Sequence, residues 1–122
     1  WTICKAVSAA PDHLESIKTA VKAGVTLVNG TDIPPGDSDD GAPIVVREME
    51  HCVEAGLSPL QAVQTATLNA AKLINSNNLG VIKPGAKADF IATTANPVED
   101  VRNLREIFFV MQGGTVVRDD RE

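Results

Sequence analysis

The stretch "VTLVNGTD", residues 25–32, decides how the chain is organised. Residues 25–28 form a short apolar run, bounded by a glycine on each side, which is typical of a parallel strand buried on both faces. A single carboxylate, Asp32, follows the run, and a loop of Pro, Gly and Asp then extends over residues 33–41, which we expect to be exposed. Two interpretations of Asp32 are open here: an ordinary turn residue, or a group at the mouth of a site.

The position of Asp32 relative to the strand favours the second interpretation. A helix is predicted over residues 12–23, because apolar residues recur there every three or four positions and Gly24 suits a left-handed C-cap. In α/β enzymes the chemistry lies beyond the carboxyl ends of the parallel strands, which is where this carboxylate falls. No strand-like run precedes the helix, and the chain starts with Trp1 rather than Met, which indicates a piece of a longer protein.

Two more helices are predicted after the loop. One covers residues 43–55 and ends at Gly56, and the other opens at Ser58 with a capping box and continues to Ile74. On the first of them the pattern predicts an apolar stripe through Val45 or Val46, Met49 and Val53, with Arg47, Glu50 and Glu54 on the polar face.

The sequence changes character near residue 78. Short strands and tight turns replace the helical periodicity, and the end of the chain indicates a β-hairpin around "QGG". We expect strands at 80–82 and 89–93, a turn at 83–85, a loop or single turn at 95–105, and hairpin strands at 107–111 and 115–118.

Composition excludes several classes of function. With 122 residues, 43% of them apolar and 22% charged, the chain is in the globular range and at most one ordinary domain. The net charge is −5 and the basic residues are scattered, which argues against nucleic-acid binding. The longest apolar stretch, Ile107–Met111, is far shorter than the roughly 20 residues that cross a bilayer. Cys4 and Cys52 are expected to be reduced thiols of a cytoplasmic protein, with a disulfide disfavoured.

Other candidate ligands are weaker than Asp32. His13 is expected at the surface, and His51 has neighbours that point in different directions on a helix, so neither predicts a metal site. The acidic loop residues Asp37, Asp39 and Asp40 suit a solvated loop or, as an alternative, a calcium site without EF-hand spacing.

The order of four motifs resembles the C-terminal part of the amidohydrolase superfamily, above all its imidazolonepropionase-like and Xaa-Pro dipeptidase-like hydrolases. These motifs are "AGVTLVNGTD", "EAGLSP", "LGVIKPGAKAD" and "VMQGG", and the resemblance extends over residues 12–118. It implies an α/β fold: the C-terminal part of a distorted TIM (β/α)8 barrel followed by part of a small β-sandwich domain. Residues 1–78 would be the last α/β elements of the barrel, and residues 79–122 the C-terminal share of the sandwich.

The resemblance also implies a function. Asp32 would be both a metal ligand and the catalytic proton shuttle of a metal-dependent hydrolase that cleaves C–N bonds of amides or cyclic amides. The cofactor would be a divalent metal such as zinc, one or two ions, with its other ligands outside this chain, so the chain alone would be inactive. Expected partners are a small-molecule or dipeptide-like substrate, the missing N-terminal portion and further copies of the protein. The alternative is a non-catalytic structural or interaction module that associates with a partner chain.

Overall fold

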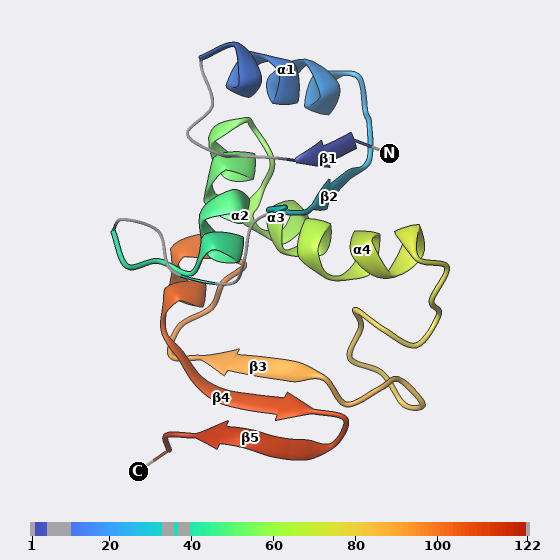
Figure 1. The fold of residues 1–122 in the computed structure, drawn as a ribbon, viewed down its shortest axis with the longest axis vertical. Coiled ribbons are helices and arrows are strands. Elements are labelled where there is room, and N and C mark those ends of the chain that lie inside the picture. Colours follow the sequence, from blue (N-terminus) through green and yellow to red (C-terminus); the bar gives the residue numbers. More distant parts are fainter. Residues whose placement is uncertain (1, 5–10, 33–35, 37–39, 122) are drawn as a thin grey trace.

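The computed structural model describes residues 2–4, 11–32, 36 and 40–121, which form an α/β arrangement with two small sheets (Figure 1). A parallel pair of strands lies between helix α1 and helices α3 and α4, with α2 beside it, and a three-stranded antiparallel sheet lies beyond these helices. In chain order the elements are β1 Thr2–Cys4, α1 Pro11–Lys22, β2 Leu27–Asn29, α2 Ile44–Glu54, α3 Pro59–Ala66, α4 Leu68–Leu73, β3 Phe90–Thr93, the 3-10 helix η1 Val101–Arg105, β4 Ile107–Gln112 and β5 Thr115–Asp119.

The prediction that no strand precedes the first helix was wrong. β1 pairs in parallel with β2, with Thr2 opposite Leu27, so β1, α1 and β2 form a β-α-β unit. A three-residue strand is too short to give a periodic signal, and its identity depends on the partner strand. β2 itself starts at Leu27 rather than Val25, because the N–H of Val25 donates to Ala20 O at 3.0 Å and closes the end of α1.

The hydrophobic core joins distant parts of the chain. Leu27 of β2 is 3% exposed and packs in one cluster with residues of α1, α2 and α3. Val101 and Leu104 belong to the same cluster, so η1 packs against the helices, where Figure 1 shows it beside α2. The core cluster consists of Ile17, Leu27, Val46, Met49, Cys52, Ala55, Ala62, Val101 and Leu104.

Helix α2 agrees with its predicted range, but its polar face does not. Glu50 was expected on the solvent side and is only 6% exposed. It tolerates burial because Arg47 and Arg105 donate hydrogen bonds to its carboxylate, and Arg105 comes from a part of the sequence that helical periodicity cannot connect to α2. Glu48, on the same helix, is also buried.

The predicted continuous helix to Ile74 is interrupted. The capping box at Ser58 is present, with Gln61 N–H donating to Ser58 Oγ, but α3 ends at Ala66 and α4 begins at Leu68. Thr67 between them has φ −123° and ψ −92°. Gly80 packs onto this break, where a Cβ would lie 2.4 Å from the carbonyl oxygen of Thr67. The interruption therefore depends on a close approach of the chain that follows α4.

Residues 80–82 form no strand, contrary to the prediction. Gly80 has φ +68° and Ile82 is 91% exposed, so this segment bends and meets no partner strand among the described residues. The following turn is confirmed, because Ala86 N–H donates to Lys83 O at 3.1 Å.

The rest of the C-terminal part follows its local signals. β3 and the β4–β5 hairpin are present nearly as predicted, and both glycines of the hairpin turn, Gly113 and Gly114, have positive φ. The loop predicted at 95–105 contains η1, whose first turn is capped by Asp100. None of the described helices has the length and apolar character that crossing a membrane would require.

Candidate functional site

Asp32 lies just beyond the carboxyl end of β2, as the sequence predicts. Leu27 and Val28 of the strand are buried, whereas Asp32 is exposed and has φ +55°. Only a few per cent of residues other than glycine adopt such a conformation, and Asp is among those that do so most readily. The carboxylate is thus presented at the end of a buried strand. Its catalytic role stays a prediction.

Two asparagine side chains hold the strand that leads to Asp32. Asn69 Nδ2, on α4, donates to Leu27 O at 2.9 Å, and Asn29 Nδ2, at the end of β2, donates to Val45 O at 3.1 Å. The first bond satisfies a strand carbonyl, and the second ties the end of the strand to the first turn of α2. Together they restrict where Asp32 can lie relative to α2 and α4.

From the sequence alone, neither Asn29 nor Asn69 was assigned a role in the site. A signal was available, because asparagine is a poor helix former and Asn69 stands in an alanine-rich helix. A polar side chain at such a position is more easily explained by a partner outside the helix.

The described residues do not contain a complete metal site. Among residues 2–4, 11–32, 36 and 40–121, no group of three or more His, Cys, Asp and Glu side chains is arranged to hold an ion. His51 Nδ1 lies 2.9 Å from Glu54 Oε2, so this histidine is engaged within its own helix. Cys52 is a buried thiol, and the side chains of Cys4 and His13 lie outside the described residues. A metal site that included Asp32 would need further ligands from outside the described residues, and the role of Asp32 as a metal ligand stays a prediction.

The calcium alternative has little support. Asp40 Oδ2 accepts from Arg105 Nη2 at 3.1 Å and lies 3.8 Å from Arg47 Nη1, so this carboxylate already neutralises positive charge. Asp37 and Asp39 lie outside the described residues. The described part of the acidic loop is engaged by arginine side chains.

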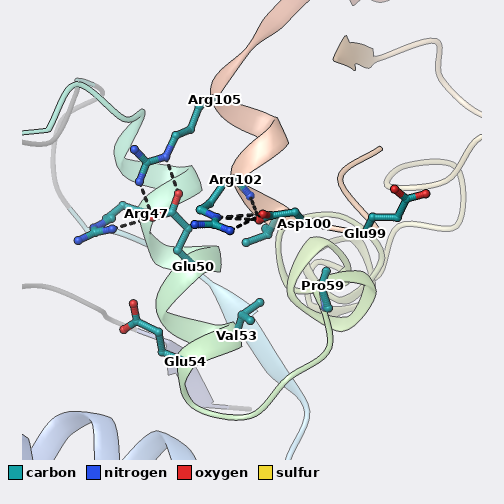
Figure 2. Close-up of a pocket in the computed structure, with 10 residues that line it drawn as sticks. Arg47, Glu50, Val53, Glu54, Pro59, Glu99, Asp100, Arg102 and Arg105 are labelled. Atoms are coloured by element: carbon teal, nitrogen blue, oxygen red, sulfur yellow. Dashed lines mark hydrogen bonds and ion pairs between the residues drawn. The ribbon is translucent and has the colours of Figure 1, made fainter. Parts of the chain in front are cut away.

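A second polar cluster lies between α2, the start of α3 and η1, beside an open cavity of about 660 Å³ (Figure 2). Arg105 donates through Nε and Nη2 to the two carboxylate oxygens of Glu50, each at 2.7 Å, and Arg47 adds a third bond of 2.7 Å. These bonds outweigh burial and hold the pKa of Glu50 below its ordinary value, and the bond to Glu50 in turn raises the pKa of Arg105.

The lowered pKa of Glu50 and the raised pKa of Arg105 keep both groups charged near neutral pH. A carboxylate with a lowered pKa, held by two guanidinium groups, is a poor proton donor or acceptor near neutral pH. Asp32 is not among the residues that line the cavity. A smaller cavity of about 250 Å³ is lined by residues 24–27, at the end of β2 opposite to Asp32, where α/β barrels keep residues for stability rather than chemistry. We assign neither cavity a catalytic role.

Comparison with known proteins gives consistent results. The sequence model of the protein family described as "Amidohydrolase family" matches residues 2–118 of this chain. An ochratoxinase of Aspergillus niger is 34% identical over 115 residues, which are 89% of this chain and 23% of that protein. An imidazolonepropionase of Geobacillus kaustophilus is 32% identical over 110 residues, which are 82% of this chain and 24% of that protein.

The fold is also similar to solved structures. The crystal structure of a Xaa-Pro dipeptidase with bound methionine aligns with a TM-score of 0.77 at 32% identity, over 88% of this chain and 26% of that one. The chain thus spans about a quarter of the length of these relatives. A parallel strand pair with Asp32 at its end, the four motifs in order and a family match over nearly all residues lead to one conclusion: the chain belongs to the amidohydrolase family.

Proposed function

We propose that this chain is the C-terminal segment of a longer metal-dependent amidohydrolase that hydrolyses C–N bonds of amides or cyclic amides. Residues 1–78 then supply the last α/β elements of a (β/α)8 barrel, and residues 79–122 supply part of a β-sandwich. The β1-α1-β2 unit supports the first assignment, and the separate antiparallel sheet of β3, β4 and β5 supports the second. The coverage of about a quarter of each relative supports the view that a larger protein is needed.

The observation that carries the proposal is the position of Asp32 at the carboxyl end of a buried parallel strand. We assign two tasks to its carboxylate: it binds the divalent metal, and it accepts a proton from the attacking water and passes it to the leaving nitrogen. Asp32 is exposed at this strand end, and a carboxylate is a side chain that both binds divalent metals and transfers protons.

The metal, when bound, lowers the pKa of its water from about 15.7 to about 7 and so makes a nucleophile available at neutral pH. Zinc is the ion we expect, as one or two ions. Catalytic zinc takes three protein ligands, so the remaining ligands would come from the part of the barrel outside this chain. Asn29 and Asn69 would keep Asp32 in place through β2 and α2.

The substrate would be a small molecule or a dipeptide-like compound, in a cytoplasmic enzyme that is free to form homo-oligomers. The similar proteins, an ochratoxinase, an imidazolonepropionase and a Xaa-Pro dipeptidase, support a hydrolase more than a non-catalytic interaction module. They do not agree on one substrate, so the proposal is limited to the class of bond.

The experiment uses the complete protein that contains this chain. It is offered a Xaa-Pro dipeptide, an N-acyl amino acid and imidazolonepropionate, and bound metal is measured by mass spectrometry. We expect the wild type to hydrolyse at least one of these, and Asp32→Asn to lower kcat by about 10²- to 10⁴-fold, the usual contribution of general acid–base catalysis, while the circular dichroism spectrum stays unchanged. A matched control is Asp120→Asn, because Asp120 is an exposed carboxylate directly after the last strand of the C-terminal sheet. Full turnover by Asp32→Asn, or no hydrolysis of any of the three compounds by the wild type, would contradict the proposal.

A further inference from the structure

Arg105 joins the C-terminal half of the chain to the β2–α2 connection, which is the segment between these two elements and contains Asp32. It ends η1, whose Val101 and Leu104 are 3% and 5% exposed and anchor the segment in the core. From this anchored position its guanidinium reaches Glu50 of α2, and also Asp40, which follows Asp32 in the connection between β2 and α2. One side chain therefore contacts both the helix and the chain segment that leads into it.

Two routes lead from Arg105 toward Asp32. Through Glu50, Arg105 fixes α2, and Val45 in the first turn of α2 accepts the hydrogen bond of Asn29 at the end of β2. Through Asp40, Arg105 fixes the end of the β2–α2 connection nearest the helix, where Ala42 N–H also donates to Asp40 Oδ1 at 3.3 Å.

The geometry of the pair favours a fixed arrangement. An arginine that binds both oxygens of one carboxylate is restricted in direction as well as distance, unlike a lysine at the same place. Glu50 is nearly fully buried, so its position is set by packing as well as by charge. Arg105 thus connects a fixed carboxylate on α2 to a more exposed carboxylate in the connection.

Arg102, in the same 3-10 helix, forms its ion pair with a residue close in sequence and serves as a comparison. Arg102 lies on the same 3-10 helix, and its guanidinium turns back to Asp100, with Nη2 at 2.6 Å from Oδ2 (Figure 2). Its side chain is 70% exposed, against 30% for Arg105. The bond of Arg102 to Asp100 stays within η1 and its cap, which makes Arg102 a matched control.

We propose that Arg105 is a positioning residue for Asp32: it ties η1 to α2 and to the β2–α2 connection, so that the C-terminal segment sets the geometry of the catalytic carboxylate. The inference rests on the proposed function of Asp32. Misplacing a catalytic group by about 1 Å costs on the order of 10²-fold in rate, so removing the connection should be visible in kcat.

The test measures steady-state kinetics of the complete enzyme, with whichever of the three compounds above the wild type hydrolyses fastest. Arg105→Gln is expected to lower kcat by about 10- to 100-fold with KM within about twofold of the wild type, and Asp40→Asn to lower kcat by a smaller factor. Arg105→Lys should recover part of the loss, because an ammonium group reaches one carboxylate and not two. Arg102→Gln should stay within about twofold of the wild type.

Two further measurements separate positioning from simple loss of folded protein. The ratio of wild-type to Arg105→Gln kcat should persist on cooling, whereas a loss caused by partial unfolding would shrink as the folded fraction recovers. The double variant Asp40→Asn/Arg105→Gln should be no slower than Arg105→Gln alone, because both changes break the same contact. If Arg105→Gln does not fold, Asp40→Asn and Arg105→Lys are still compared with Arg102→Gln.

The outcomes are distinct. Any of three results overturns the positioning role: a kcat for Arg105→Gln equal to that of Arg102→Gln, a kcat ratio of wild type to Arg105→Gln that falls to one on cooling, or losses that multiply in the double variant. The hydrolase proposal stays in place in these cases as long as Asp32→Asn is inactive. Where Arg105→Gln does not fold, an Asp40→Asn rate equal to that of Arg102→Gln does the same. An active Asp32→Asn removes both.

Discussion

The region around β2 and the sheet of β3, β4 and β5 are held by different kinds of contact. Around β2 and α2, the deciding bonds join residues far apart in sequence: Asn69 to Leu27 across 42 positions, and Arg105 to Glu50 across 55. In the sheet, β4 and β5 are joined by a tight glycine turn, and β5 is exposed along its whole length. The candidate catalytic residue thus belongs to the region that depends on distant contacts, and substitutions should have larger effects there than in the hairpin.

The largest difference in stability is expected between a core leucine and a hairpin valine. Leu27→Ala should lower the free energy of unfolding by about 2–5 kcal/mol, because it opens a cavity next to the helices. Val117→Ala, at a position 63% exposed on β5, should stay within about 0.5 kcal/mol. Urea unfolding of the complete protein, followed by circular dichroism, measures both. Equal effects would break the contrast between the two regions.

The second effect concerns the close approach at the α3–α4 break. Gly80→Ala should cost about 2–4 kcal/mol, since the methyl group would collide with the Thr67 carbonyl and alanine disfavours φ +68°. Gly85→Ala is the matched control, because Gly85 also has positive φ but has nothing within 4 Å of the added methyl group. It should cost about 1–2 kcal/mol from backbone strain alone. Thermal unfolding midpoints of the two variants in the complete protein would show the order, and a larger loss for Gly85→Ala would disprove the role of the contact.

The third effect depends on pH and concerns Glu50. Glu50→Gln should lower stability at neutral pH by about 1–2 kcal/mol, because the charged hydrogen bonds to two partly solvated arginines are lost. The pKa of Glu50 in the folded protein lies below 4.5, its ordinary value. The contribution is therefore fully present above about pH 4.5 and is lost as the pH falls through the folded pKa.

Urea unfolding between about pH 7 and about pH 3 tests this, since the curves of wild type and Glu50→Gln should converge at the acid end. The control is Glu54→Gln, whose partner His51 is on the same helix and whose side chain is 54% exposed. It should change stability by at most about 1 kcal/mol. A constant difference between wild type and Glu50→Gln across the whole range would show that the charge of Glu50 does not matter.

The smallest effect is local to the sheet. Asp89 Oδ1 accepts from the Gly113 N–H of the hairpin turn at 2.5 Å, and this bond, with Lys87, lowers the pKa of Asp89. Asp89→Ala should speed hydrogen exchange of the Gly113 amide without changing exchange in β2. Amide exchange followed by mass spectrometry or NMR measures this. Faster exchange in β2 as well would mean that the two regions are coupled more strongly than their contacts indicate.

Much of the fold could be predicted from local sequence rules. Helix α1 with Gly24 at its end, the capping box at Ser58, and the hairpin around Gly113 all follow from short-range chemistry that the sequence displays. Three of the errors share one cause. β1, the burial of Glu50 and the break at Thr67 each depend on a partner that lies elsewhere in the chain, namely β2, Arg105 and Gly80.

The candidate site divides in the same way. The sequence by itself determined the family resemblance and the place of Asp32 after a buried strand. The reason is that apolar runs and turn residues can be recognised from residues that are close together in the sequence. Only the tertiary structure decided that Asn69, Asn29 and Arg105 hold that strand and its connection, and that Glu50 is buried. The physical reason is that a side-chain hydrogen bond to a distant carbonyl or carboxylate leaves no periodic trace in the sequence, and its partner is fixed only when the helices pack.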